Sequence, residues 1–107
     1  MIDPDARARF RTYRASPSRQ ARNRLVEEHI GFADFLARRF ANRGEPTDDL
    51  RQVAMVGLVK AVERFDPERG VTFSSFAVPT ITGEIKRHFR DRTWSVRVPR
   101  NLQELTM

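Results

Sequence analysis

The stretch DLRQVAMVGLVKAVERFDPERGVTFSSFA, residues 49–77, decides the fold that we expect of this chain. Its first part has apolar residues at spacings of three and four, which indicate a helix with one buried face. We expect this helix to begin at a cap on Thr47 or Asp48 and to end near Arg64. A glycine inside a helix costs about 1 kcal/mol relative to alanine, so Gly57 indicates close packing against another helix. The expected buried stripe consists of Leu50, Val53, Ala54, Gly57, Leu58, Ala61 and Phe65.

Downstream, the cluster Asp66–Gly70 has the composition of a turn, and a further helix is predicted after it. Either Ser74 or Ser75 can cap this helix, which we expect to reach about Asp91. Pro79 either kinks its first turns or marks its true start, because proline lacks a backbone donor.

Upstream, a helix is predicted over residues 19–42, and Gly31 leaves open whether it is one helix or two. Gly44 is expected to supply its C-terminal cap, and the proline that follows prevents continuation. A short helix over residues 6–14, capped by Asp3, is predicted before it. The apolar stripe of the longer helix consists of Leu25, Val26, His29, Ile30, Phe32, Ala33, Leu36, Ala37 and Phe40.

These elements predict an all-α fold, a compact bundle of about four helices without strands. Residues 1–24 form an N-terminal basic helical extension in this interpretation, and residues 25–93 form the helical domain. Residues 94–107 are expected to be a linker into the start of a further, truncated helix. Within it, Trp94–Pro99 is predicted to be extended, because its apolar residues alternate and it ends in proline.

Composition limits the classes of protein to which the chain can belong. Its 107 residues fit one domain, and the absence of cysteine excludes disulfides and thiolate chemistry. The sequence has neither a long apolar run nor a signal peptide, so we expect a cytoplasmic protein. Residues 1–24 carry a net charge of +5, residues 25–70 of −2 and residues 71–107 of +3. This distribution suits a polyanion at the ends and a protein partner in the middle, although solvated charged faces explain it equally well.

Catalytic and metal-binding patterns are weak. His29 and His88 lie on different predicted helices and lack the spacing of metal ligands. The sequence has no glycine-rich phosphate loop. Asp48 and Asp49 are adjacent on a helix, so their side chains diverge by about 100° and are better explained as charges near a helix N-terminus. We therefore expect a binding module that is not an enzyme and that needs no metal or other cofactor.

Aromatic and basic residues alternate in the last predicted helix and beyond it. A ring that stacks on an unpaired base contributes roughly 1–3 kcal/mol, and cations hold the nucleic-acid backbone. Phe73 and Phe89 are interpreted as core residues, whereas Phe76 and Trp94 are the candidates for exposure. The cations interleaved with these rings are Lys86, Arg87, Arg90, Arg92 and Arg97.

Residues 49–77, followed by VPTITGEIKRHFRD (78–91) and WSVRVPRNL (94–102), resemble region 2 of bacterial RNA polymerase sigma factors. The second and third segments are similar to the stress and sporulation branch, the sigma-B and sigma-F type. The resemblance covers about residues 25–105, and a run of this length in fixed order is highly specific.

This resemblance implies one surface for core RNA polymerase. The helix that starts near Asp49 matches the segment that docks on the β′ coiled coil of the polymerase. Asp49 and Gln52 match polar contact positions, and Met55 and Val56 lie near the same face. Val53 stands where the family often has an acid, so no salt bridge is expected there.

The resemblance also implies a surface for the promoter minus-ten element. Phe76 matches the aromatic residue that stacks against the flipped adenine, on the non-template single strand. Pro79 and Thr80 replace the tryptophan pair of primary sigma factors, which implies weaker intrinsic melting. Gly83 and Lys86 occupy the positions that read the upstream base pair, but Gly83 has no side chain with which to read it. The remaining candidates for DNA contact are Arg87, Arg90, Arg92 and Trp94.

The expected function is that of an alternative sigma factor domain, which binds core polymerase and melts the minus-ten element during transcription initiation. A complete sigma factor needs a later helix-turn-helix, so this chain is interpreted as a fragment. The branch also implies regulation by an anti-sigma factor of the serine-kinase fold. The alternative is a protein-interaction domain that is chiefly bound and regulated by such a factor and does not bind DNA by itself.

Overall fold

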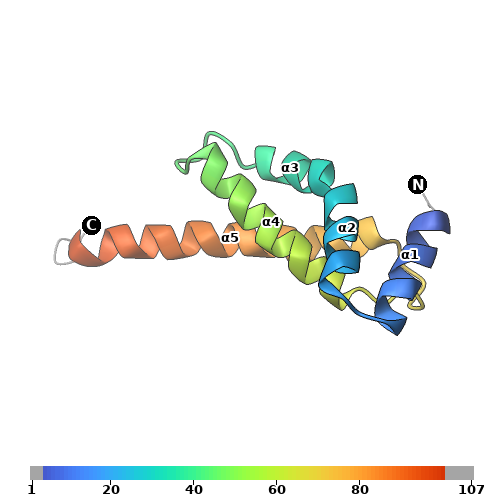
Figure 1. The fold of residues 1–107 in the computed structure, drawn as a ribbon. Coiled ribbons are helices and arrows are strands. Elements are labelled where there is room, and N and C mark those ends of the chain that lie inside the picture. Colours follow the sequence, from blue (N-terminus) through green and yellow to red (C-terminus); the bar gives the residue numbers. More distant parts are fainter. Residues whose placement is uncertain (1–3, 101–107) are drawn as a thin grey trace.

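A computed structural model gives the backbone of residues 4–100 and the side chains of residues 6–92 (Figure 1). Within residues 4–100 the chain forms helices and turns and no strand, so the predicted all-α class is confirmed. No helix in this part combines the length and the apolarity that a bilayer crossing needs. The helices are α1 (Pro4–Ala15), α2 (Arg19–Glu28), α3 (Ile30–Arg38), α4 (Thr47–Arg64) and α5 (Phe73–Arg100).

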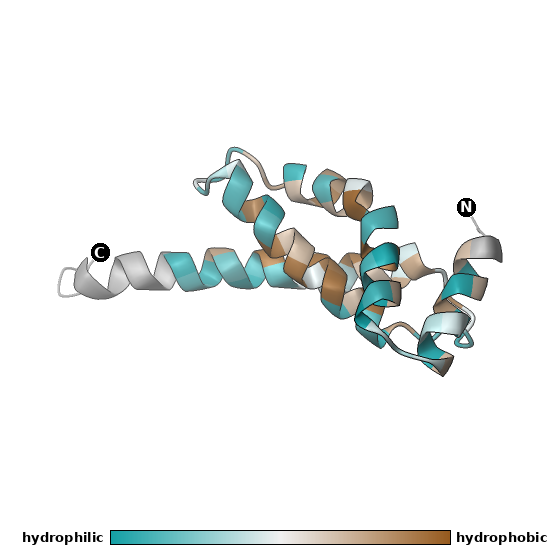
Figure 2. Cartoon of the chain, in the orientation of Figure 1, coloured by the Kyte–Doolittle hydropathy of each residue, from teal (hydrophilic) through white to brown (hydrophobic). Residues whose placement is uncertain are grey.

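Helix α4 is the centre of the domain and crosses α5 (Figure 1). Gly57 is buried at this crossing, and a Cβ atom added to it would lie 2.8 Å from the Cα atom of Ile81. The close packing predicted from a glycine inside the helix is therefore confirmed. Hydrophobic residues gather in the middle of α4, while α5 becomes mainly hydrophilic beyond the crossing (Figure 2). The fully buried residues of α4 and α5 include Leu50, Ala54, Leu58, Ala61, Val62, Ala77, Ile81 and Ile85.

Helix α1 packs on the domain as part of its core. The ring of Phe10 is 1% exposed, and its centroid lies 4.9 Å from the ring of Phe65 and 4.8 Å from that of Phe73. Arg14 Nη1 donates a hydrogen bond of 3.0 Å to the carbonyl oxygen of Phe65, and Arg11 pairs with Glu68. The N-terminal basic segment therefore completes the aromatic core at the end of α4.

The long upstream helix is divided, but at His29 and not at Gly31. His29 adopts φ −118° and ψ 12°, and its backbone N–H donates to the carbonyl of Val26. Helix α3 then ends at Arg38, earlier than predicted, and continues as turns through Asn42, which has a positive φ of 67°. Gly44, expected as the cap, instead lies in the loop that follows these turns, where its φ is 99°.

The predicted side-chain caps of α4 and α5 were wrong. Pro46 is the N-cap residue of α4 and makes no side-chain cap, so neither Thr47 nor Asp48 caps the helix. At the start of α5, Thr72 Oγ1 accepts a hydrogen bond of 3.1 Å from the backbone N–H of Ser75. Thr72 therefore caps α5, the role that was predicted for Ser74 or Ser75.

Helix α5 also differs from prediction at both ends. It begins at Phe73, so Pro79 lies inside it and does not mark its start. It continues past Asp91 to Arg100, so the extended linker predicted over Trp94–Pro99 is helical instead. No glycine interrupts residues 84–100, and Pro99 removes a backbone donor only next to the last helical residue. Asp3 and residues 101–107 lie outside the described part of the chain.

Candidate functional site

One face of α5 carries most of the residues predicted to contact DNA. At about 100° per residue, Phe76, Lys86, Arg87 and Arg90 fall within roughly 100° of arc around the helix. The opposite face is buried against α4, through Ala77, Ile81 and Ile85 at steps of four residues. The three cations on the outer face are exposed to solvent. The helix therefore displays one aromatic ring and a basic stripe on the face that it does not use for packing.

Phe76 is half-buried, whereas the sequence predicted an exposed ring. Its ring centroid lies 5.5 Å from that of Phe65, so it packs on the edge of the core. Phe73 is 7% exposed, and Phe89 packs partly against the core, as predicted for both. Pro79 and Thr80, which stand where the resemblance places the tryptophan pair of primary sigma factors, are exposed and half-buried, respectively.

Two other predicted DNA contacts stand apart. Arg92 lies on the core side of α5, where its Nε is 3.4 Å from Oε1 of Glu45. Its guanidinium group is therefore engaged within the protein and separated from the stripe of Lys86, Arg87 and Arg90. The side chain of Trp94 lies outside the described residues.

A second surface lies where α3 and α4 run side by side. Gln52 and Met55 of α4 line a surface pocket of about 310 Å³ together with Ile30 and Asp34 of α3. Val56, one turn beyond Gln52, is 49% exposed. Three of the four residues predicted to contact the polymerase thus share one neighbourhood, which combines apolar side chains with charged and polar ones and is open to solvent.

An ion pair forms one wall of this pocket. The guanidinium group of Arg51 donates two hydrogen bonds of 3.0 Å to the carboxylate of Asp34. These bonds favour the charged form of the acid, and they lower the pKa of Asp34 below its ordinary value of 3.8. The pair fixes α3 to α4 at the pocket.

Asp49 turns away from this pocket. It is half-buried in the first turn of α4 and lies close to Glu45 and His88. The sequence gives no sign that these three residues meet, because they come from a loop and two helices. Phe35 was also not predicted as a surface residue, although it is 57% exposed on α3 and lies off the buried stripe of that helix. Its position outside the apolar periodicity of the helix was the signal in the sequence that could have predicted an exposed ring.

A bundle with these two surfaces matches a known family. Residues 25–95 match the family model described as Sigma-70 region 2, which covers more than half of the chain. The chain belongs to the sigma-70 family, and the matched segment is region 2.

Several curated relatives belong to the branch that the sequence resembles. The chain is 61% identical over 84 residues to the RNA polymerase sigma factor SigF of Mycobacterium tuberculosis (strain ATCC 25618 / H37Rv), an alignment that covers 78% of this chain and 32% of the relative. It is 50% identical over 86 residues to the RNA polymerase sigma-F factor of Kitasatospora aureofaciens, an alignment that covers 80% of this chain and 29% of the relative. It is 46% identical over 93 residues to the RNA polymerase sigma-B factor of Bacillus subtilis (strain 168), an alignment that covers 87% of this chain and 36% of the relative. The chain therefore spans about a third of the length of these relatives.

Proposed function

We propose that this chain is the part of an alternative sigma factor that docks on core RNA polymerase and opens the promoter minus-ten element. The observation that supports it best is the separation of two surfaces on one packed core. A surface pocket lined by both apolar and polar side chains lies between α3 and α4, and a basic stripe with one aromatic ring lies on the outer face of α5.

The α3–α4 surface is proposed to receive the β′ coiled coil. Burying apolar surface stabilises a complex by roughly 25 cal/mol per Å², so exposed side chains such as Val56 and Ile30 favour a protein partner. Gln52 is exposed at the same place and can hydrogen-bond to a partner at the edge of the interface. Asp49 contributes less in this proposal, because its carboxylate turns towards α5.

The outer face of α5 is proposed to hold the non-template strand. Lys86, Arg87 and Arg90 are positioned to contact phosphates, which orient a strand without specifying its sequence. Phe76 lies on the same face and is proposed to stack on the unpaired base. Because the ring already packs on Phe65, it needs little further ordering to act as a platform.

A binding experiment with core polymerase tests the docking proposal. Core polymerase, or its isolated β′ coiled coil, is retained on the immobilised chain, and retention is compared for the wild type and Val56→Asp. We expect Val56→Asp to lose most of the retention, because it places a charge in an apolar contact. Val71→Asp is the matched control, since Val71 is 44% exposed and lies in the turn before α5. Equal retention by Val56→Asp and the control would contradict the proposal.

A second experiment tests the nucleic-acid face. The polymerase complex formed with the chain is titrated with a fluorescent single strand that carries a minus-ten sequence. Phe76→Ala is expected to weaken binding by about 5-fold or more, as the loss of about 1–3 kcal/mol of stacking implies. Phe89→Ala is the control, because Phe89 is also a partly buried phenylalanine of α5 but packs near Phe40. Similar losses in both variants would indicate a general defect of the helix.

An anti-sigma factor is the second partner that we propose, and Phe35 is the observation that favours it. Its ring is 57% exposed on α3, one of the two helices that line the pocket proposed for the polymerase. An exposed aromatic residue is typical of protein interfaces. If binding to such a factor were the whole function, Arg87→Ala and Arg90→Ala would leave the activity of the domain unchanged.

A further inference from the structure

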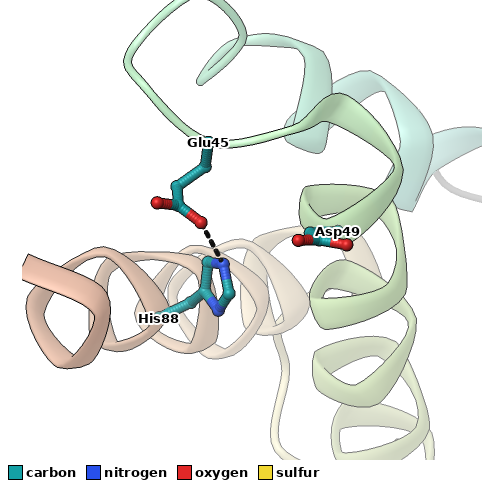
Figure 3. Close-up of side chains that lie close together, drawn as sticks. All are labelled: Glu45, Asp49 and His88. Carbon is teal, nitrogen blue, oxygen red and sulfur yellow. Dashed lines mark hydrogen bonds and ion pairs between the residues drawn. The ribbon is translucent and has the colours of Figure 1, made fainter. Parts of the chain in front are cut away.

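Three potential ligand side chains converge at the end of the α3–α4 loop, and of these only Asp49 has a part, a minor one, in the proposed function (Figure 3). Glu45 comes from the loop, Asp49 from the first turn of α4 and His88 from α5. One ligand atom of each residue lies within 4.8 Å of those of the other two. Nε2 of His88 and Oε1 of Glu45 are already 3.0 Å apart.

The backbone holds Glu45 in place. Gly44, with a φ of 99°, occupies a conformation that suits glycine, and Pro46 follows directly. A proline restricts the residue before it to extended conformations, so Glu45 has little freedom. Pro46 is also the N-cap residue of α4, which places Asp49 one turn away. The cluster is therefore preorganised by the same loop that begins the helix.

The cluster is shielded from solvent, yet its charges are not fully matched. The side chains of Glu45 and His88 are 14% and 19% exposed. Arg92 is 3.4 Å from Glu45 and is the cation nearest to that carboxylate. Among residues whose side chains the structure describes, Asp49 has no hydrogen bond or ion pair. A half-buried carboxylate that faces an imidazole and a second carboxylate favours an added cation.

We infer that Glu45, Asp49 and His88 form a binding site for a divalent transition-metal cation of the zinc class. An imidazole nitrogen with two carboxylate oxygens suits zinc, whereas magnesium and calcium prefer oxygen ligands alone. Bonds of about 2.0–2.2 Å to a tetrahedral ion place ligand atoms roughly 3.3 Å apart, so small rotations of the side chains close the site. Water completes the coordination. Occupied, the site ties the α3–α4 loop to α5.

Calorimetric titration of zinc into the untagged chain tests this inference. We expect saturable binding of one ion per chain and no binding of magnesium at the same concentration. Glu45→Gln and His88→Gln should each weaken zinc binding by more than about 10-fold, the lower end of the loss seen even for outer-shell partners. Asp48→Asn is the matched control, because Asp48 is an exposed carboxylate next to the cluster and outside it. It should bind zinc like the wild type.

A measurement on the wild type removes any ambiguity from misfolded variants. The chain has two histidines, so paramagnetic cobalt can be located by its effect on their ring resonances in NMR spectra. Cobalt should broaden the signals of His88 and spare those of His29, which packs near Phe10 and Phe73. Broadening of both rings or of neither, or unchanged zinc affinity in Glu45→Gln and His88→Gln, would overturn the inference. Neither Glu45 nor His88 is a proposed contact of polymerase or DNA, so these outcomes are independent of the proposed function.

Discussion

Replacing Gly57 with alanine tests the crossing of α4 and α5 directly. The added Cβ atom would meet the Cα atom of Ile81 at 2.8 Å, and it would also approach side-chain atoms of Ile81 and Glu84 at 3.4 and 3.3 Å. The nearest of these is a backbone atom, which cannot rotate away. The two helices must therefore separate or slide to admit one methyl group.

The size of the effect follows from two opposing terms. Alanine is favoured over glycine inside a helix by about 0.8–1.0 kcal/mol. Forcing an extra methyl group into a packed core costs about 1–3 kcal/mol, and the contact with backbone places this case in the upper part of that range. We expect a net loss of about 1–2 kcal/mol, which lowers the Tm of a domain of this size by at least about 4 °C.

Urea and thermal denaturation, followed by circular dichroism at the helical band, measure this loss. Gly83→Ala is the matched control, because Gly83 is exposed in α5 and a Cβ atom there would have no atom within 4 Å. The control should gain up to about 1 kcal/mol from helix propensity alone. A Gly57→Ala variant as stable as the control would refute the inferred close packing.

Three further predictions concern stability and binding. Because Arg51 lowers the pKa of Asp34, the pair stabilises the fold above the ordinary pKa of the acid and loses this effect as the pH falls through the folded value. The stability difference between wild type and Arg51→Gln should therefore shrink below about pH 4 in urea titrations; a constant difference would contradict the pairing. Phe10→Ala should cost about 3–5 kcal/mol in the same assay, and a loss below about 1 kcal/mol would mean that α1 is not part of the core. In salt titrations of single-strand binding, removing Arg87 and Arg90 together should reduce the log–log slope by about 1.4, whereas an unchanged slope would exclude phosphate contacts.

The sequence predicted the centre of the fold because local periodicity and packing agree there. The stripe predicted for α4 is the stripe that α4 buries, except that Val53 is only partly buried and Val62 was missed. Gly57 was informative because a residue that disfavours helix must have a packing reason to stand inside one. The resemblance to sigma factors supplied the fold of the same segment independently, and the family match agrees with it.

The features that prediction missed depend on contacts between distant parts of the chain. Nothing near Phe10 in the sequence indicates that its ring packs against Phe65 and Phe73. The break at His29 likewise has no local breaker, and Gly31, the expected breaker, lies inside α3. Helix propensity is a weak signal at such positions, and tertiary packing decides them.

The candidate sites also differ in how far the sequence could predict them. Lys86, Arg87 and Arg90 could be placed on one face by counting along a helix. The convergence of Glu45 with His88 could not, because the two residues are 43 positions apart and meet only through the packing of the loop on α5. Side chains that tertiary structure alone brings together have no characteristic spacing in the sequence from which their contact could be predicted.

The docking of α1 also determines the order in which the domain can be completed during its synthesis. Arg11 and its partner Glu68 are 57 residues apart in the chain, and Phe73 follows still later. At a translation rate of about 5–20 residues per second, several seconds pass before these partners of α1 exist. Until then the ring of Phe10 lacks the rings of Phe65 and Phe73, on which it packs in the finished domain. Helix α1 is thus synthesised well before the aromatic surface on which it docks.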